Sequence, residues 1–204
     1  ILVVNRDIFL RSFMLEIIFV SFLMTSGKFG DVELAATQIL LQFLHISAYG
    51  MDGFAFAAEV LVGQAVGKSN RSMLRDAVVK SGVWTFTIAV FMAVTYAFLG
   101  GFFIAIMTTS NEVRLVSENF LIFIVLGPIF GALPFLMDGI FVGATRSVDM
   151  RNMMFLSLII YALSAYILIN LYGFYGHWVA LLVSYAARGI SLLTKYPRLE
   201  SSII

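Results

Sequence analysis

The chain of 204 residues has no cysteine, only two histidines and three prolines, and only 12% of its residues are charged. Without cysteine, disulfide frameworks, thiolate metal sites and cysteine nucleophiles are excluded. His45 and His177 fall in different apolar segments, and no H-E-x-x-H or G-x-S-x-G motif is present, so we expect neither an enzyme, a cofactor nor a metal site. The net charge of +1 and the lack of a basic patch argue against a nucleic-acid partner.

Apolar residues dominate what remains. They make up 61% of the chain, and the mean hydropathy is +0.98, whereas soluble domains have about 45–50% apolar residues. Most of the apolar segments reach the ~20 residues that cross a bilayer core. There are six, at roughly 8–25, 34–66, 78–99, 120–144, 153–171 and 177–194. This pattern predicts an all-α membrane protein, a single six-helix transmembrane bundle over residues 1–204 within a lipid bilayer.

Three local irregularities are expected. The second apolar segment is too long for one straight span, so we expect a distorted helix near Gly50 and Gly53. Pro128 and Pro134 remove two backbone donors from the fourth segment and predict a kink there. Between the third and fourth segments, residues 100–119 are predicted to form a short interfacial helix.

The basic residues are sorted between alternate connections. All thirteen Lys and Arg residues except Lys28 and Arg114 fall at the chain ends or in the second and fourth loops. Cytoplasmic loops of membrane proteins carry such an excess, whereas a soluble core would not sort its cations in this way. The sequence therefore predicts a multi-pass protein of the cytoplasmic (inner) membrane with both ends in the cytoplasm.

Four polar residues are spaced by seven in the second segment: Gln38, His45, Asp52 and Glu59. Seven residues are nearly two helical turns, so the four share one slowly drifting face. Ionisable groups at this depth are costly and indicate a site or pathway. For Asp52 and Glu59 the alternative is a hydrogen-bonded clamp between helices; Gln38 and His45 lie toward the outer end, where they could line a cavity or be structural.

Asp138 in the fourth segment is the other deep acid. It lies eight residues before Arg146, about as far inside the cytoplasmic end as Glu59, so the two could face one cavity. The functional interpretation is a carboxyl group that loads and releases a proton or cation. The structural interpretation is a bond to a neighbouring helix or an ion pair with Arg146. Phe54 and Phe135 could offer cation-π contacts nearby, or serve in packing alone.

Small residues predict close helix packing. Glycines recur four residues apart in three places, a spacing that lets helices approach closely and is more typical of packing than of dimerisation. The pairs are Gly63 with Gly67, Gly127 with Gly131, and Gly139 with Gly143.

Several of these segments together resemble the C-terminal half of a transporter of the multidrug and toxic compound extrusion (MATE) family, in its DinF-like branch. The specific parts are the stretch from Met51 to Gly67, containing Asp-Gly-Phe-Ala and Val-Gly-Gln-Ala-Val-Gly, and the stretch from Met137 to Arg146, containing Asp-Gly-Ile-Phe. Asn5-Arg6-Asp7, Leu34 to Gln38, and Met150-Arg151-Asn152 support the likeness, which covers nearly the whole chain in order.

The resemblance implies an antiporter of twelve helices in two six-helix lobes, which exports cationic or amphipathic small molecules in exchange for protons or sodium ions. This chain would be the C-terminal lobe, and its partner the missing N-terminal lobe; the start at Ile1 and the six spans agree with a fragment or a split gene. In sodium-coupled relatives, acids on the first and fourth helices of this lobe form a cation site. Asp138 matches the fourth-helix position and Glu16 lies within about one residue of the first, although Glu16 could equally line an interhelical contact. In DinF-like members the proton-coupling aspartate belongs to the other lobe.

Two other classes are considered. A lipid-linked oligosaccharide flippase or polysaccharide exporter of related architecture should have cationic grooves, whereas we expect an acidic interior here. The third possibility is a non-transporting half that serves only as a structural partner.

Overall fold

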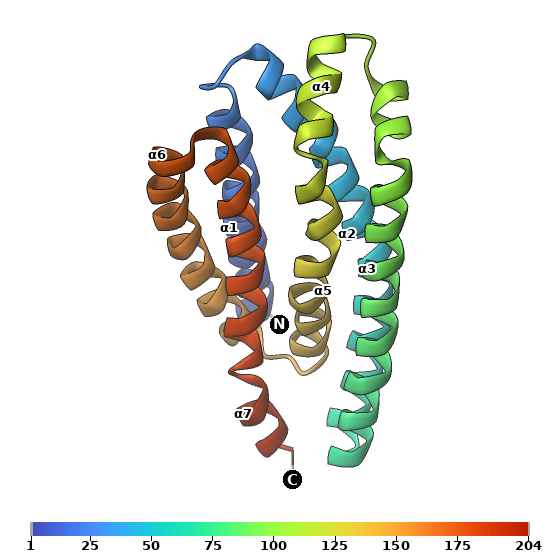
Figure 1. The fold of residues 1–204 in the computed structure, drawn as a ribbon. Coiled ribbons are helices and arrows are strands. Elements are labelled where there is room, and N and C mark those ends of the chain that lie inside the picture. Colours follow the sequence, from blue (N-terminus) through green and yellow to red (C-terminus); the bar gives the residue numbers. More distant parts are fainter. Residues whose placement is uncertain (1, 204) are drawn as a thin grey trace.

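The computed structural model describes residues 2–203, with side chains from residue 4 onward, and these residues form seven α-helices and no strand (Figure 1). The helices are α1 (Leu2–Ser26), α2 (Asp31–Gly67), α3 (Arg71–Met107), α4 (Asn111–Asn119), α5 (Leu121–Gly143), α6 (Ser147–Leu193) and α7 (Tyr196–Ser201).

Helix α6 consists of two antiparallel legs, 147–172 and 174–193, which meet at Gly173 (Figure 1). Gly173 has φ 58° and ψ −134°, a conformation that favours glycine because a Cβ would be strained there. A Cβ on Gly176 would overlap the carbonyl of Leu168, so the two legs pass in close contact. With α1, α2, α3 and α5, the two legs give six apolar helices in the predicted order.

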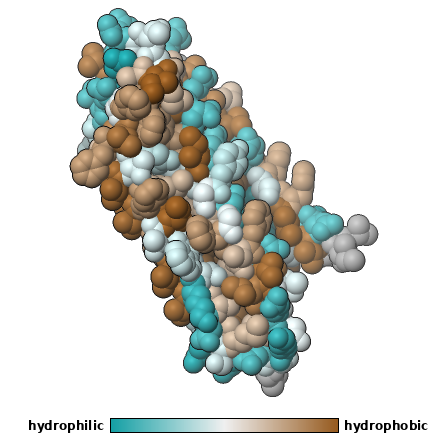
Figure 2. All heavy atoms as spheres, turned by 90° about the vertical axis from the view of Figure 1, so that its right-hand side faces the viewer, coloured by the Kyte–Doolittle hydropathy of each residue, from teal (hydrophilic) through white to brown (hydrophobic). Residues whose placement is uncertain are grey.

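Four stretches of the described chain are long and apolar enough to cross a membrane. They are Val4–Ser26, Arg71–Met107, Leu121–Gly143 and Ser147–Ser201, the last of which includes both legs of α6. Helix α2, which carries the polar stripe, is not among them. In Figure 2, which views the molecule from the right-hand side of Figure 1, hydrophobic side chains cover much of the middle and hydrophilic ones gather toward the two ends. A surface of this kind suits a bilayer.

The structure agrees with some of the predicted local irregularities and differs from others. A short helix does form between α3 and α5, but it covers only residues 111–119; residues 100–107 extend α3, so that part of the prediction was wrong. Gly100 tolerates the extension because it lies buried against Leu121 of α5. Helix α2 continues through Gly50 and Gly53 without a break, and α5 remains helical through both prolines.

Helix α5 is at the centre of the bundle, packed against α2, α3 and α6. Its glycines make the contact with α2 very close: a Cβ on Gly139 would overlap the carbonyl of Ala55, and one on Gly143 would overlap that of Glu59. A Cβ on Gly127 would likewise overlap the side chain of Leu44 on α2. Two of the three predicted glycine pairs are therefore helix-packing positions on one interface.

Candidate functional site

Three charged side chains from three helices meet inside the bundle. The guanidinium groups of Arg11 on α1 and Arg188 on α6 both donate to Oδ2 of Asp138 on α5. The side chain of Asp138 is 10% exposed, that of Arg188 4% and that of Arg11 17%. The three side chains form a largely buried ion-pair cluster, which we call the Asp138 cluster.

Local packing brings Arg188 to Asp138. The neighbouring Gly189 faces α5, where an added Cβ would lie 2.9 Å from Cδ of Pro134 and 3.0 Å from Leu133. Only a residue without a side chain allows the second leg of α6 to come this close. Asp138 lies five residues before the end of α5, and Arg188 five residues before the end of α6, so both lie ~8 Å inside the helix ends.

Two further side chains border the cluster. Asp52 on α2 is half-buried and within electrostatic range of both Arg188 and Arg11. The guanidinium carbon of Arg188 lies 5.6 Å from the ring centroid of Phe135, a cation-π contact. Two carboxyl groups and two guanidinium groups leave the site without net charge. Oδ1 of Asp138 and Nε of Arg188 are buried and have no hydrogen-bond partner among the described residues.

Both arginines were missed as site residues, because the sequence assigned them to the cytoplasmic side as topology signals. Asp138 pairs with Arg11 and Arg188 and not with Arg146, which lies half-buried beside a small cavity near α7. The expectation of an acidic interior was wrong for the same reason, because two arginines lie at Asp138. A signal was present: Arg11 and Arg188 stand inside apolar segments, where an arginine is costly and functional by default.

The seven-residue stripe is divided along α2. Gln38 and His45 are exposed, and the imidazole of His45 lies 5.9 Å from the ring of Phe19. Asp52 and Glu59 are half-buried, and Asp52 lies within electrostatic range of the two arginines of the Asp138 cluster. The stripe is therefore an open face of α2 at its outer end and becomes part of the site deeper in the bundle.

Glu16 does not reach Asp138. It is exposed on α1 and lines a shallow apolar groove together with Phe13 and Ile17. Glu16 follows Arg11 by five residues, which places the two side chains roughly 140° apart around the helix. The α1 residue at Asp138 is thus an arginine, where the resemblance implied an acid.

Phe54 also points elsewhere. Its ring stacks on Trp84 of α3, with centroids 6.4 Å apart and ring planes within 5° of parallel. This contact is aromatic packing between α2 and α3. Of the two phenylalanines predicted to line a cavity, only Phe135 contacts the Asp138 cluster.

Helix α1 is also fastened to α6 near both of its ends. Asp7 is fully buried; Nη1 of Arg151 lies 2.8 Å from Oδ1 of Asp7, and Arg6 is a second, more exposed partner. At the other end, Nε2 of His177 lies 3.1 Å from the hydroxyl of Ser26 and 2.9 Å from the carbonyl oxygen of Phe22. These contacts join α1 to both legs of α6.

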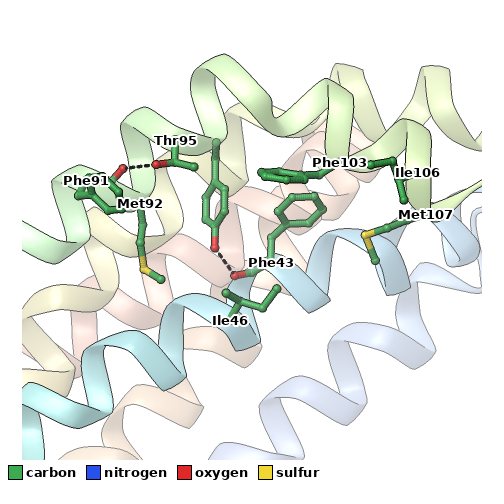
Figure 3. A pocket seen from close by; sticks show the side chains of 9 residues that line it. Phe43, Ile46, Phe91, Met92, Thr95, Phe103, Ile106 and Met107 are labelled. Carbon is green, nitrogen blue, oxygen red and sulfur yellow. Dashed lines mark hydrogen bonds between the residues drawn. The ribbon is translucent and has the colours of Figure 1, made fainter.

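A larger cavity of about 340 Å³ lies between α2 and α3 and carries no charge (Figure 3). Phe43, Met92 and Phe103 are typical of its lining. Its two hydroxyls are already bonded, Thr95 to the carbonyl of Phe91 at 2.8 Å and Tyr96 to that of Phe43 at 3.0 Å. The cavity has no free polar group to recognise a charged ligand.

The described residues contain no group of three His, Asp or Glu side chains that could hold a metal ion. A metal ion at Asp138 would need further carboxylate ligands, but the groups next to Asp138 are the guanidinium groups of two arginines. The chemistry that the site offers is the exchange of cationic partners at one carboxylate.

Comparison with known proteins gives two matches. The MatE family profile matches residues 8–167. The chain is also 35% identical over 202 residues to DNA damage-inducible protein F of Escherichia coli (strain K12). The alignment covers 97% of this chain and 43% of that protein, so the chain spans less than half the length of this relative.

Proposed function

Since the chain belongs to the MatE family, whose members are membrane transporters and not enzymes, we propose that it is the C-terminal six-helix lobe of a cation-coupled antiporter. The complete protein exports cationic or amphipathic small molecules across the cytoplasmic membrane in exchange for protons or sodium ions. Both ends of this lobe lie in the cytoplasm, in keeping with the sorting of basic residues between alternate connections.

The observation that carries the proposal is the pairing of buried Asp138 with arginines from two other helices. An ionised carboxylate costs roughly 2.5–3.5 kcal/mol at the centre of a membrane helix on the lenient insertion scale, and one buried in the bundle nearer the helix end still needs a cationic partner or a proton. Here the partners come from α1 and α6, so a change of partner also changes how these helices are held. Mutually exclusive occupation of one carboxylate by a substrate cation and a proton couples their movements.

The other acids have supporting roles in this proposal. Asp52 borders the cluster and is half-buried, so it can attract an incoming cation toward Asp138. Glu59 lies on the same helix, one stripe position closer to the cytoplasmic end. Phe135, already in contact with Arg188, can stack against an organic cation. Glu16, Gln38 and His45 lie on exposed faces, where the other lobe could cover them.

The partner is the missing N-terminal lobe. The chain spans 43% of the length of its relative, in keeping with one lobe of two. A transport cavity formed between two lobes would be incomplete in this chain, so the chain alone should not transport.

A lipid-linked oligosaccharide flippase or polysaccharide exporter is the second candidate. The observation that favours it is the pair of arginines, buried Arg188 and half-buried Arg11, which could bind a phosphate or pyrophosphate group. In this case Asp138 would neutralise the arginines while the anionic substrate is absent. A non-transporting structural half would use the same cluster only to hold three helices together.

Substitution of Asp138 by Asn in the complete transporter tests the proposal. Proton-driven efflux of an organic cation from vesicles should fall at least tenfold, ~1.4 kcal/mol, at unchanged protein abundance. Asp76→Asn, at an exposed carboxylate on α3, is the matched control and should leave efflux unchanged. Undiminished efflux by the Asp138 variant would assign coupling to the other lobe. Export of an anionic lipid-linked sugar with no cation efflux would support the second candidate.

A further inference from the structure

We infer that Arg11 is a built-in competitor of the transported cation: it occupies Asp138 in the empty site and is displaced from it when an external organic cation binds. This inference rests on the proposed function, because it takes Asp138 as the carboxylate that meets the cation. It assigns a specificity role to a residue of α1 that neither the sequence nor the family resemblance places at the site.

The two arginines on Asp138 are held differently. Arg188 is 4% exposed, contacts Phe135 and lies beside Gly189, where α6 presses on α5. Arg11 is 17% exposed, and nothing comparable holds it: each arginine makes its only side-chain hydrogen bond among the described residues to Asp138, so the difference between them lies in burial and packing. Arg11 is therefore the partner that can leave, while Arg188 is fixed by its surroundings.

Because of the position of α1 in the bundle, exchange of Arg11 for another cation at Asp138 would also let α1 move relative to α5. Helix α1 packs mainly on α6 and only lightly on α2, and it is fastened to α6 through Asp7 and Ser26. The described residues include no extensive packing of α1 on α5, so Arg11 is the main polar connection between these two helices. When Arg11 leaves Asp138, this edge of α1 is released from α5 while its attachments to α6 remain.

The geometry also restricts which cations can compete. Both guanidinium groups converge on the same oxygen, Oδ2 of Asp138, and no cluster of three acidic or histidine side chains lies in the described chain to complete a metal shell. A sodium ion beside two guanidinium groups would be repelled and would lack further oxygen ligands, so of the two coupling ions in the proposed function this site favours the proton. An organic cation can replace Arg11, with Asp52 nearby for the displaced positive charge.

The first experiment measures binding of tetraphenylphosphonium, a permanent lipophilic cation, to the purified complete transporter. Arg11→Gln should bind it about tenfold more tightly than the unmodified protein, because the competing charge is gone. Arg11→Lys, which keeps the charge, should bind as the unmodified protein does. Arg71→Gln, at an exposed arginine whose side chain bonds only a backbone carbonyl, is the control and should change nothing. In an Asp138→Asn background, Arg11→Gln should give no gain.

Equal or weaker binding by Arg11→Gln would overturn the inference, because removal of a competing charge must raise the affinity for the cation. If the gain persisted without the Asp138 carboxylate, the inference would also fail.

A second measurement does not depend on any substrate. This chain has no cysteine, so once any cysteine of the other lobe is replaced, spin labels can be placed in the complete transporter at Phe13→Cys on α1 and Phe130→Cys on α5, both exposed positions. Arg11→Gln should broaden the distance distribution between the labels, and Arg11→Lys should keep it narrow. An unchanged distribution in Arg11→Gln would disprove the connection. A broadened distribution with no binding of the cation by any variant would instead refute the cationic substrate class of the proposed function.

Discussion

Two interfaces of this bundle are built in opposite ways. Between α2 and α5, glycines bring backbone against backbone, and Gly139 and Gly143 sit on the carbonyls of Ala55 and Glu59. Helix α1, by contrast, is connected to α5 through the side chain of Arg11. A backbone contact has no alternative partner and is fixed by shape, whereas an ion pair can be exchanged for another. The bundle thus combines a rigid pair of helices with an edge that can be released.

The largest effect is expected at the rigid interface. Gly139→Ala places a methyl group on the carbonyl of Ala55, so α2 and α5 must separate; the expected loss is about 2–3 kcal/mol of unfolding free energy. Gly53→Ala is the control, because an added Cβ there meets nothing within 4 Å. Unfolding in detergent, followed by circular dichroism, compares the two. Equal stability of both variants would show that α2 and α5 can accommodate the methyl group. The α2–α5 interface would then be no more rigid than the contact of α1 with α5.

A smaller effect is expected where α1 joins α6. Asp7→Asn leaves Arg151 without its buried partner and should cost about 1–2 kcal/mol, reduced by the partial exposure of both arginines that contact Asp7. Asp149→Asn, at a half-buried acid without an ion pair in the described chain, is the control. Spin labels on α1 and α6 would then report a looser α1. If Asp7→Asn had no effect on stability or on these distances, α1 would be held by apolar packing alone.

The smallest perturbation tests orientation. Single cysteines at Asn70 and Asp149, in or next to the two connections predicted to be cytoplasmic, should react with an impermeant thiol reagent only in opened cells. Asn70 caps α3 through its side chain, so Asn70→Cys should cost about 1 kcal/mol of stability, and a cysteine at the neighbouring Ser69, which leaves this cap in place, is the control. Labelling from outside intact cells would show that these connections face the outside and that the predicted orientation of the chain is wrong.

The sequence predicted the number and order of the apolar helices, because each needs only a run of apolar residues of sufficient length. It also predicted the glycine contacts of α5, since spacing by four is a property of one helix. The Asp138 cluster could not be predicted in this way. Which side chains meet across three helices depends on the rotation of each helix about its axis, and no pattern within one segment fixes that rotation.

The end of α3 was predicted wrongly for a different reason. The sequence predicted a surface helix over residues 100–119, yet α3 continues through Gly100 and Gly101 to Met107, because glycine in a membrane helix is tolerated where a neighbour packs closely. Burial of Gly100 against Leu121 supplies that neighbour, and it comes from a helix that begins later in the chain.

The turn at Gly173 has a consequence for biogenesis. The two legs of α6 are joined by a single non-helical residue, and the exposed rings of Tyr172 and Tyr175 flank it as interfacial anchors do. With no loop to translocate between them, we expect the legs to leave the translocon and enter the bilayer as one helical hairpin. Membrane integration of a nascent chain stopped at residue 172 should then be markedly weaker than that of one stopped at residue 193, and equal integration of both would show that the legs insert one after the other.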